Sequence, residues 1–170
     1  MKRSANSLPL LTTLVGLISR PGATLLPAEL EDAGSLAALH ASSFRRGWSV
    51  EEFERLLIEP NVIADRAMAR RRLAGFVLSR IAADQAEILS IAVAARFRRH
   101  GLAGKLLNVH FYRLKAAGVQ SVFLEVDERN VPARRLYARF GFNEVGRRKS
   151  YYADADREAG TALVLRRDLV

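Results

Sequence analysis

The stretch RRHGLAGKLL, Arg98 to Leu107, places two arginines and a histidine directly before a glycine and a leucine-rich segment. The first turn of a helix has backbone N–H groups without acceptors inside the helix, and such groups bind phosphate. Gly101 would let a diphosphate approach the main chain closely, while Arg98 and Arg99 supply charge and directional donors. The pattern predicts a phosphate-binding turn. An ordinary surface turn at a helix start would look the same locally.

A single carboxylate lies in the apolar segment SVFLEV, residues 121–126. In a strand, Phe123 and Glu125 would share one face, and three aliphatic residues the other. If apolar neighbours desolvate the Glu125 side chain, its pKa rises and the carboxylate becomes a better general base. If that face is open to water, Glu125 is an unexceptional edge-strand residue. The residues alone leave both readings open.

A tyrosine lies in the next segment, NVPARRLYARFGF, which predicts a short helix. Asn130 can cap its N-terminus, Pro132 suits its first turn, and Gly141 follows its end. Tyr137 carries a phenol that can donate a proton, but it also lies close to the core candidate Phe140, where packing would explain it.

Hydrophobic periodicity predicts the elements that position these residues. A strand near Thr24–Leu26 precedes a helix containing Leu36 and Leu39, and a second helix begins at Ser49 with a capping box to Glu52. Three short strands then follow in NVIADRAMA, LAGFVLSRI and AEILSIAV, separated by the charged turns RRR and AADQ. The remaining elements are a helix over 102–117 that stops at Gly118, the strand 121–126, the helix 130–140, and strands over 142–151 and 161–167.

This order predicts an α/β fold with a mixed, mostly antiparallel sheet flanked by helices on both faces. Residues 24–170 are expected to form a single domain. Residues 1–23 are expected to form a flexible N-terminal extension.

Composition limits the possible partners. The chain has 170 residues, a formal net charge of +9 and a pI near 10.7, so it will attract phosphorylated cofactors, nucleic acid or acidic membrane surfaces. The absence of cysteine excludes disulfides and cysteinyl intermediates and suits a reducing compartment. The three histidines are too scattered to predict a metal site. The apolar run Leu8–Ile18 loosely resembles a secretory signal, but it is too short to span a bilayer, and we expect a cytoplasmic protein without membrane attachment.

The spacing Arg98-x-x-Gly101-x-Ala103 resembles the acyl-CoA pyrophosphate loop of the GCN-five-related N-acetyltransferases, the GNAT family, whose pattern is Gln/Arg-x-x-Gly-x-Gly/Ala. Ala103 replaces the more usual second glycine, a departure that the broader pattern allows. The segments ILSIAV, LEVDERN and LYARFGF resemble further family segments in the same order. GWSVEEF and RRKSYY are similar to the RimI-type ribosomal-protein-alanine N-acetyltransferases, a subgroup of this family.

This resemblance implies acetyl-CoA as co-substrate and no metal. It implies that Glu125 is the general base, that Tyr137 protonates the departing thiolate and that Tyr151 and Tyr152 contact the substrate backbone. The residues that would hold acetyl-CoA form a longer set: Ile91, Ala92, Val93, Arg98, Arg99, His100, Gly101, Leu102, Ala103, Gly104 and Asn130.

The predicted activity is acetylation of the N-terminal α-amine of a protein, and the resemblance points to a ribosomal protein that begins with alanine. An α-amino group has a reference pKa near 8 and a lysine near 10.4, so the terminal amine loses its proton more easily. The basic chain should repel basic substrates, which acids such as Asp127, Glu128, Asp154 and Asp156 could offset. The alternatives are acetylation of a small amine or another protein amine, and a catalytically inactive nucleic-acid- or ribosome-binding module that uses ARRR and GRRKS.

Overall fold

The computed structural model describes residues 22–149 and 160–169, and it confirms the predicted order of elements. Residues 1–21 of the expected extension, and both candidate substrate tyrosines, Tyr151 and Tyr152, lie outside the described residues. The elements are β1 (Thr24–Pro27), α1 (Ala33–Ser43), α2 (Val50–Ile58), β2 (Val62–Ala69), β3 (Arg72–Ala82), β4 (Gln85–Val93), α3 (Leu102–Ala116), β5 (Ser121–Asp127), α4 (Val131–Arg139), β6 (Asn143–Lys149) and β7 (Thr161–Asp168), with short 3₁₀ turns η1 (Leu30–Asp32) and η2 (Ala95–Phe97).

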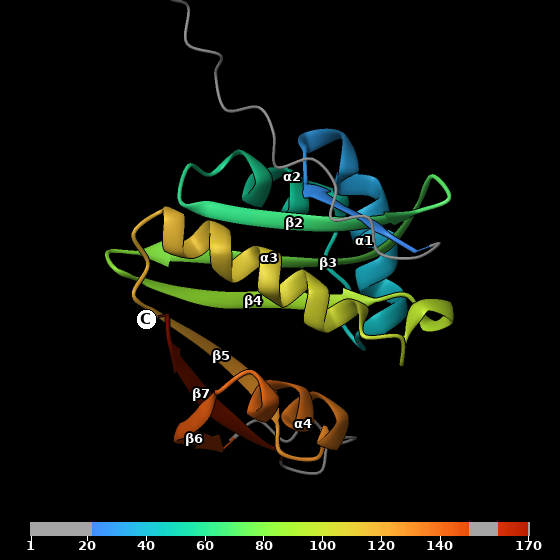
Figure 1. Cartoon of the computed structure of the whole chain (residues 1–170). Helices are drawn as coiled ribbons and strands as arrows, with labels where there is room; N and C mark the ends of the chain where they lie inside the picture. Colours follow the sequence, from blue (N-terminus) through green and yellow to red (C-terminus); the bar gives the residue numbers. More distant parts are fainter. Residues whose placement is uncertain (1–21, 150–159, 170) are drawn as a thin grey trace, which may run out of the picture.

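The strands form one sheet in the order β1-β2-β3-β4-β5-β7-β6 (Figure 1). Every neighbouring pair is antiparallel except β4 and β5, which are parallel because α3 connects them across one face of the sheet. The expected mixed, mostly antiparallel α/β sheet is therefore confirmed.

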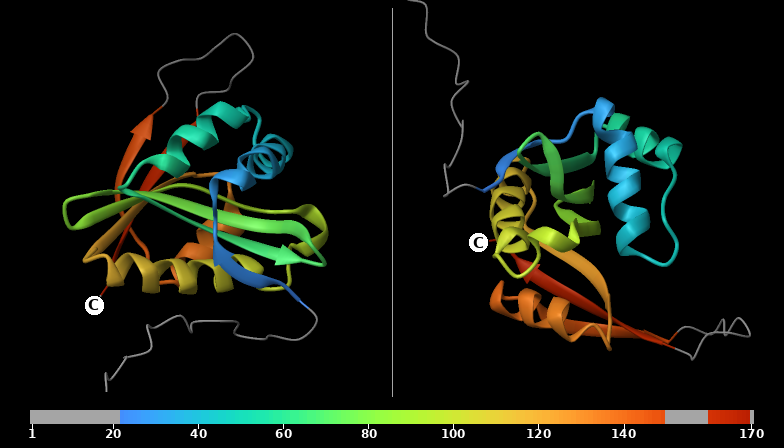
Figure 2. Two further views of the ribbon diagram at one scale, coloured as in Figure 1. Left: turned by 90° about the horizontal axis from the view of Figure 1, so that it is seen from above. Right: turned by 90° about the vertical axis from the view of Figure 1, so that its right-hand side faces the viewer.

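Helices cover both faces of this sheet, as the views in Figure 2 show. On the α1/α2 face, Leu36 and Phe53 pack with the strand residues Phe76 and Leu78. On the α3/α4 face, α3 and Tyr137 of α4 pack with the alternate residues of β5. Each fully buried large apolar side chain stabilises the fold by about 1.5–3 kcal/mol, so burial on both faces fixes the register of every central strand.

The helix ends follow the sequence signals. The Glu52 N–H donates to Ser49 Oγ over 3.2 Å and the Ser49 N–H donates to Glu52 Oε2 over 2.7 Å, which is the predicted capping box. The Ala133 N–H donates to Asn130 Oδ1 over 3.2 Å, so Asn130 caps α4. A cap of this kind stabilises a helix by about 1 kcal/mol.

A buried polar network holds α3 against β2 and β3. His110 Nδ1 lies 2.6 Å from Asp65 Oδ2, and His110 Nε2 lies 2.7 Å from Ser79 Oγ. Arg113 pairs with the other oxygen of Asp65. Asp65, Ser79 and His110 are fully buried, so a substrate cannot reach them. The network instead fixes α3, and with it the turn at its N-terminus.

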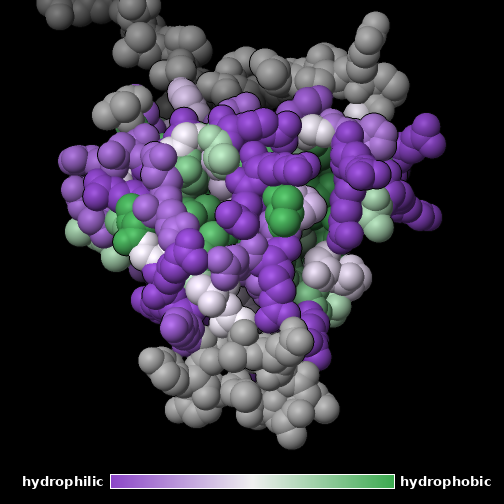
Figure 3. All heavy atoms as spheres, turned by 90° about the horizontal axis from the view of Figure 1, so that it is seen from below, coloured by the Kyte–Doolittle hydropathy of each residue, from purple (hydrophilic) through white to green (hydrophobic). Residues whose placement is uncertain are grey.

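The described surface is largely polar. The face in Figure 3 is dominated by hydrophilic residues, with hydrophobic ones in separate small areas. Within 22–149 and 160–169, no helix is both long enough and apolar enough to cross a membrane.

Candidate active site

The neighbouring strands β4 and β5 part halfway along their length, as Figure 1 shows. Their parallel pairing runs only from Gln85↔Ser121 to Ile88↔Leu124, while β5 stays paired with β7 as far as Asp127. Leu89 is an extra residue in β4 relative to β3, and a bulge of this kind bends a strand. The β4 edge beyond Leu89 therefore has backbone groups that no neighbouring strand uses.

Strand alternation tells which β4 amides face this opening. The Ala94 N–H donates to Ala74 O over 2.9 Å, so Ala94 faces β3, and by alternation Ala92 does too. The Val93 carbonyl accepts instead from Arg98 Nε over 2.8 Å. Ile91 and Val93 thus direct their main-chain groups to the parted edge, whereas Ala92 belongs to the β3 ladder and the α1/α2 core.

The turn before α3 is shaped as an anion cradle. Gly101 is the N-cap of α3 and has φ of 74°, a left-handed conformation that favours glycine. Within residues 22–149 and 160–169 no side chain caps this helix end, so the first N–H groups of α3 have no acceptor there. A Cβ at Gly101 would meet nothing within 4 Å, so the space above the turn is open. These features fit a diphosphate.

The other predicted loop residues have distinct environments. Arg98 links the loop to the end of β4, as described, and His100 Nδ1 lies 2.7 Å from the Arg98 carbonyl oxygen. The Arg99 side chain is exposed, and its backbone adopts the left-handed conformation with φ of 65°. Leu102 is buried in the α3/α4 core and Ala103 is half-buried. Gly104 serves packing, because a Cβ there would lie 3.3 Å from the Phe140 ring.

Glu125 is the first β5 residue beyond the β4–β5 pairing. It points to the α1/α2 face together with Phe123, as predicted, while Val122, Leu124 and Val126 are buried on the other face. The alternative of a desolvated carboxylate is wrong, because the side chain is 38% exposed and pairs with Arg148 Nη1 over 3.0 Å. The alternative of a glutamate on a face open to water is confirmed, although β5 is not an edge strand, since it lies between β4 and β7.

A cavity of about 300 Å³ adjoins Glu125 on this face. Its walls include Arg148 and also Glu87, whose carboxylate forms no ion pair within the described ranges. Sequence reasoning missed both residues. Glu87 comes beside Phe123 only through the β4–β5 pairing, and Arg148 reaches Glu125 from β6, so no local pattern indicated either contact.

Tyr137 is 6% exposed and lies on the α3/α4 face, with its ring edge-on to Phe142 at 5.6 Å. Burial raises its pKa to about 12, so the phenol keeps its proton at neutral pH. In the part of the chain that the structure describes, its hydroxyl makes no hydrogen bond and is available as a donor. Glu125 and Tyr137 thus lie on opposite faces of the sheet beside the parted strands.

The acids that were expected to attract a basic substrate are largely occupied. Asp127 pairs with Arg129 over 3.9 Å and Glu128 pairs with Arg147 over 3.0 Å. Asp154 and Asp156 lie outside the described residues. Among the described residues, no cluster of histidine and carboxylate side chains could hold a metal ion.

Comparison with known proteins agrees with this geometry. The sequence profile of the acetyltransferase (GNAT) family matches residues 34–142. The chain is 33% identical over 90 residues to the ribosomal protein bS18-alanine N-acetyltransferase of Haemophilus ducreyi, an alignment that covers 53% of this chain and 62% of that protein. A Bacillus subtilis relative, whose name assigns the same activity provisionally, is 33% identical over 132 residues, 76% of this chain and 87% of the relative.

Solved structures show the same fold. The crystal structure of the ribosomal-protein-S18-alanine N-acetyltransferase from Escherichia coli superposes with a TM-score of 0.79 and 25% identity, covering 86% of this chain and 94% of that one. Arabidopsis thaliana NAA60, solved in complex with acetyl-CoA, superposes with a TM-score of 0.73 and 23% identity over 84% of this chain and 97% of that chain.

Proposed function

Because the matched region covers more than half of its length, the chain belongs to the GNAT acetyltransferase family, and we propose that it acetylates the N-terminal α-amine of a protein. The proposed acceptor is a ribosomal protein that begins with alanine, as the names of its relatives suggest. The observation that carries the proposal is the position of Glu125, where β4 and β5 part. There a carboxylate faces a small cavity that lies along the paired halves of β4 and β5.

Acetyl-CoA, the acyl donor of the family, supplies an activated thioester. The uncapped N–H groups at the start of α3 would hold its pyrophosphate, with Arg98 and Arg99 adding charge. The main-chain N–H groups of Ile91 and Val93 would donate to the thioester oxygen as negative charge develops on it. Asn130 already caps α4 through its side chain and would add a contact to the donor near the other strand.

Glu125 is the proposed general base. Its carboxylate is open to the cavity and held by Arg148, so an incoming ammonium would replace the guanidinium as its partner. An α-amine needs little help at neutral pH because its reference pKa lies near 8. An exposed carboxylate is therefore sufficient for this acceptor, whereas a lysine side chain, with a reference pKa near 10.4, would need more help to lose its proton.

Tyr137 is the proposed donor to the leaving sulfur. A phenol with a pKa of about 12 does not readily protonate an ordinary thiolate, because the corresponding thiol has a pKa of only about 8.5 in water. Desolvation, however, raises the pKa of a thiol as well as that of the phenol. A thiolate bound beside Tyr137 in this apolar core would be desolvated too, so Tyr137 would stabilise it by hydrogen bonding and then protonate it.

The cavity beside Glu125 suits the first residues of a polypeptide better than a large cofactor-like acceptor, since its volume of about 300 Å³ is at the small end of ligand sites. The wall residue Glu87 adds negative charge for an ammonium group. We further propose a cytoplasmic location, where ribosomal proteins are made, and residues 24–170 as one catalytic domain.

The test is to measure thiol release from acetyl-CoA with three matched peptides. One begins with a free alanine, the second has the same sequence with a blocked N-terminus, and the third is blocked and contains an added lysine. We expect turnover with the first peptide alone, with mass spectrometry locating the acetyl group on its α-nitrogen. Turnover of the third peptide would show that a lysine is accepted. Turnover of none of the three, by a folded protein that binds acetyl-CoA, would contradict peptide acetylation.

A further inference from the structure

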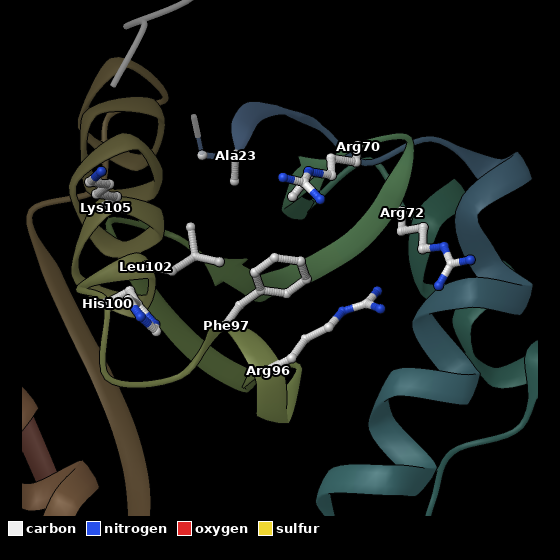
Figure 4. Close-up of a pocket in the computed structure, with 10 residues that line it drawn as sticks. Ala23, Arg70, Arg72, Arg96, Phe97, His100, Leu102 and Lys105 are labelled. Atoms are coloured by element: carbon white, nitrogen blue, oxygen red, sulfur yellow. The ribbon is translucent and has the colours of Figure 1, made fainter. Parts of the chain in front are cut away.

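A second, larger cavity lies at the end of the sheet, apart from the one beside Glu125. Its volume is about 1040 Å³, and it lies between the β2–β3 turn, η2 and the first turns of α3 (Figure 4). We name it the turn pocket. Its charged lining is entirely basic and consists of Arg70, Arg72, Arg96 and Lys105, with His100 beside them.

The cations of the turn pocket lack acidic partners. Arg70, Arg72, Arg96 and Lys105 form no ion pair within residues 22–149 and 160–169. Some arginines elsewhere in the described residues are neutralised by acids, such as Arg66 by Asp32 and Arg80 by Glu59. In the other basic stretch that the sequence singled out, GRRKS, Arg147 pairs with Glu144 and Glu128, and Arg148 with Glu125. The turn pocket is thus a concentration of positive charge that an external anion could neutralise.

The β2–β3 turn carries one of the lining arginines, Arg70, at a conformational cost. Arg70 and Arg71 form a two-residue hairpin loop between Ala69 and Arg72, with φ of 48° and 63°. Hairpins of this type favour Asn-Gly because both positions need positive φ. A side chain in this region costs on the order of 1 kcal/mol per residue. Strain of this kind occurs at functional sites, and here it places Arg70 at the rim of the cavity.

The pocket also offers an aromatic surface. Phe97 lies in its wall, and the Arg96 guanidinium carbon lies 4.9 Å from the centre of its ring. In Figure 4 the Arg70 and Arg96 side chains extend toward the space beside this ring. Ala69 and Leu102 add apolar wall. Phe97 itself is half-buried. A basic groove with an accessible aromatic ring is the combination by which proteins hold single-stranded nucleic acid, with phosphates on the cations and a base on the ring.

We propose that the turn pocket binds a segment of single-stranded RNA. The turn pocket is large, and its cations come from three separate elements. It therefore fits several phosphates of one strand better than a single phosphate. The site adjoins the acetyl-CoA cradle, with His100 and Leu102 common to both, and extends from the α3 N-terminus toward β2 and β3. Binding there is independent of the acceptor assigned above and does not require catalysis.

The experiment measures binding of the full chain to a fluorescent single-stranded RNA oligonucleotide by anisotropy, over a series of salt concentrations. The test variant combines Arg70→Gln, Arg72→Gln and Arg96→Gln. The control combines Lys115→Gln, Arg135→Gln and Arg139→Gln, exposed cations outside the pocket, and so removes the same charge. The test variant should bind roughly 10-fold more weakly and lose about 2 from the slope of log affinity against log salt, since each phosphate contact contributes about 0.7. The control should bind like the parent.

Two further measurements separate this site from the acetyl-CoA site. Phe97→Leu should weaken RNA binding several-fold with an unchanged salt slope, because stacking is lost and no charge is removed. Saturating acetyl-CoA should leave RNA affinity unchanged, and the triple arginine variant should acetylate the alanine-initiated peptide at the parental rate. An equal loss in test and control variants would overturn the proposal, because binding would then depend on net charge alone. Displacement of RNA by acetyl-CoA would assign the pocket to the acyl donor instead.

Discussion

Arg148 Nη1 lies 3.0 Å from Glu125 Oε1, so a guanidinium from β6 holds the carboxylate that the proposed mechanism uses as a base. Both side chains are open to water, at 74% and 38% exposure. Exposed pairs of this kind contribute at most about 1 kcal/mol. The contact is therefore weak enough for an acceptor ammonium to replace Arg148, and it should set the affinity for the acceptor more than the rate of the chemical step.

Replacing Arg148 with glutamine should lower the KM for the alanine-initiated peptide by about 2- to 5-fold with kcat nearly unchanged, because the ammonium no longer competes with a guanidinium. Steady-state kinetics at saturating acetyl-CoA measure both constants. The matched control is Arg147→Gln, since Arg147 pairs with Glu144 and Glu128 and not with Glu125. A rise in KM in the Arg148 variant would mean that Arg148 helps to bind the acceptor.

Glu125→Gln keeps the shape of the side chain but removes the base, so turnover of the same peptide should fall most near neutral pH. Raising the pH should partly restore it, because the fraction of neutral α-amine grows as the pH passes about 8. The measurement compares parent and variant across pH, with folding checked at each point. Glu144→Gln, another exposed glutamate held by an arginine, is the control. A ratio of rates that stays constant with pH would contradict the role of Glu125 in deprotonating the ammonium.

Tyr137→Phe keeps the ring against Phe142 and removes only the donor, so turnover should fall by about 10- to 10⁴-fold with acetyl-CoA affinity preserved. Because burial raises the pKa of Tyr137 to about 12, the parent should show no loss of the donor up to about pH 10. The exposed Tyr112, changed to phenylalanine, serves as the control. If the Tyr137 variant turns over as fast as the parent under conditions where chemistry limits the rate, then Tyr137 serves only in packing.

The order of elements and the helix ends were predictable because they depend on local interactions. The Ser49–Glu52 capping box and the Asn130 cap involve residues three apart, and the alternation of Glu125 with its aliphatic neighbours is a property of any strand. The left-handed turn at Gly101 follows from the residue type itself. These features need no knowledge of how distant segments meet.

The surroundings of Glu125 were not predictable because they depend on the order of strands in the sheet. Sequence patterns do not show that β5 pairs with β7 along its length and with β4 along only half of it. They also do not show which arginines find a carboxylate. Arg148 pairs with a residue 23 positions away in sequence, while the equally basic Arg70 and Arg72 have no such partner among the described residues.

His40 should make the protein less stable in mild acid. Its ring is stacked between Phe44 and Trp48, and its Nδ1 accepts from the Trp48 N–H over 3.0 Å. Burial lowers the pKa of His40 below its ordinary value of 6.5, partly offset by the charge of Glu52. The folded state therefore binds its proton less readily than the unfolded state, and stability present above pH 6.5 is lost as the pH falls through that value and below.

The measurement for His40 is the free energy of unfolding by urea, from about pH 7.5 to about pH 5.5. In His40→Gln, whose side-chain oxygen can still accept from Trp48, the fall in stability over this window should be smaller than in the parent. His100→Gln, at an exposed histidine, should leave the parental pH dependence unchanged. If the His40 variant follows the parental curve, His40 is not the group responsible for it.

Replacing Gly101 with valine should weaken CoA binding by roughly 10-fold or more, because a β-branched side chain over the open turn keeps a diphosphate from the N–H groups of α3. Valine is also strained at φ of 74°, so a loss of affinity could reflect distortion alone. Gly118→Val separates the two effects, since Gly118 has φ of 86° and open space around it but lies at the other end of α3. Calorimetry with CoA should show a loss only for the Gly101 variant, with similar destabilisation of both. Equal CoA affinities in the two folded variants would contradict the assignment of the pyrophosphate site to this turn.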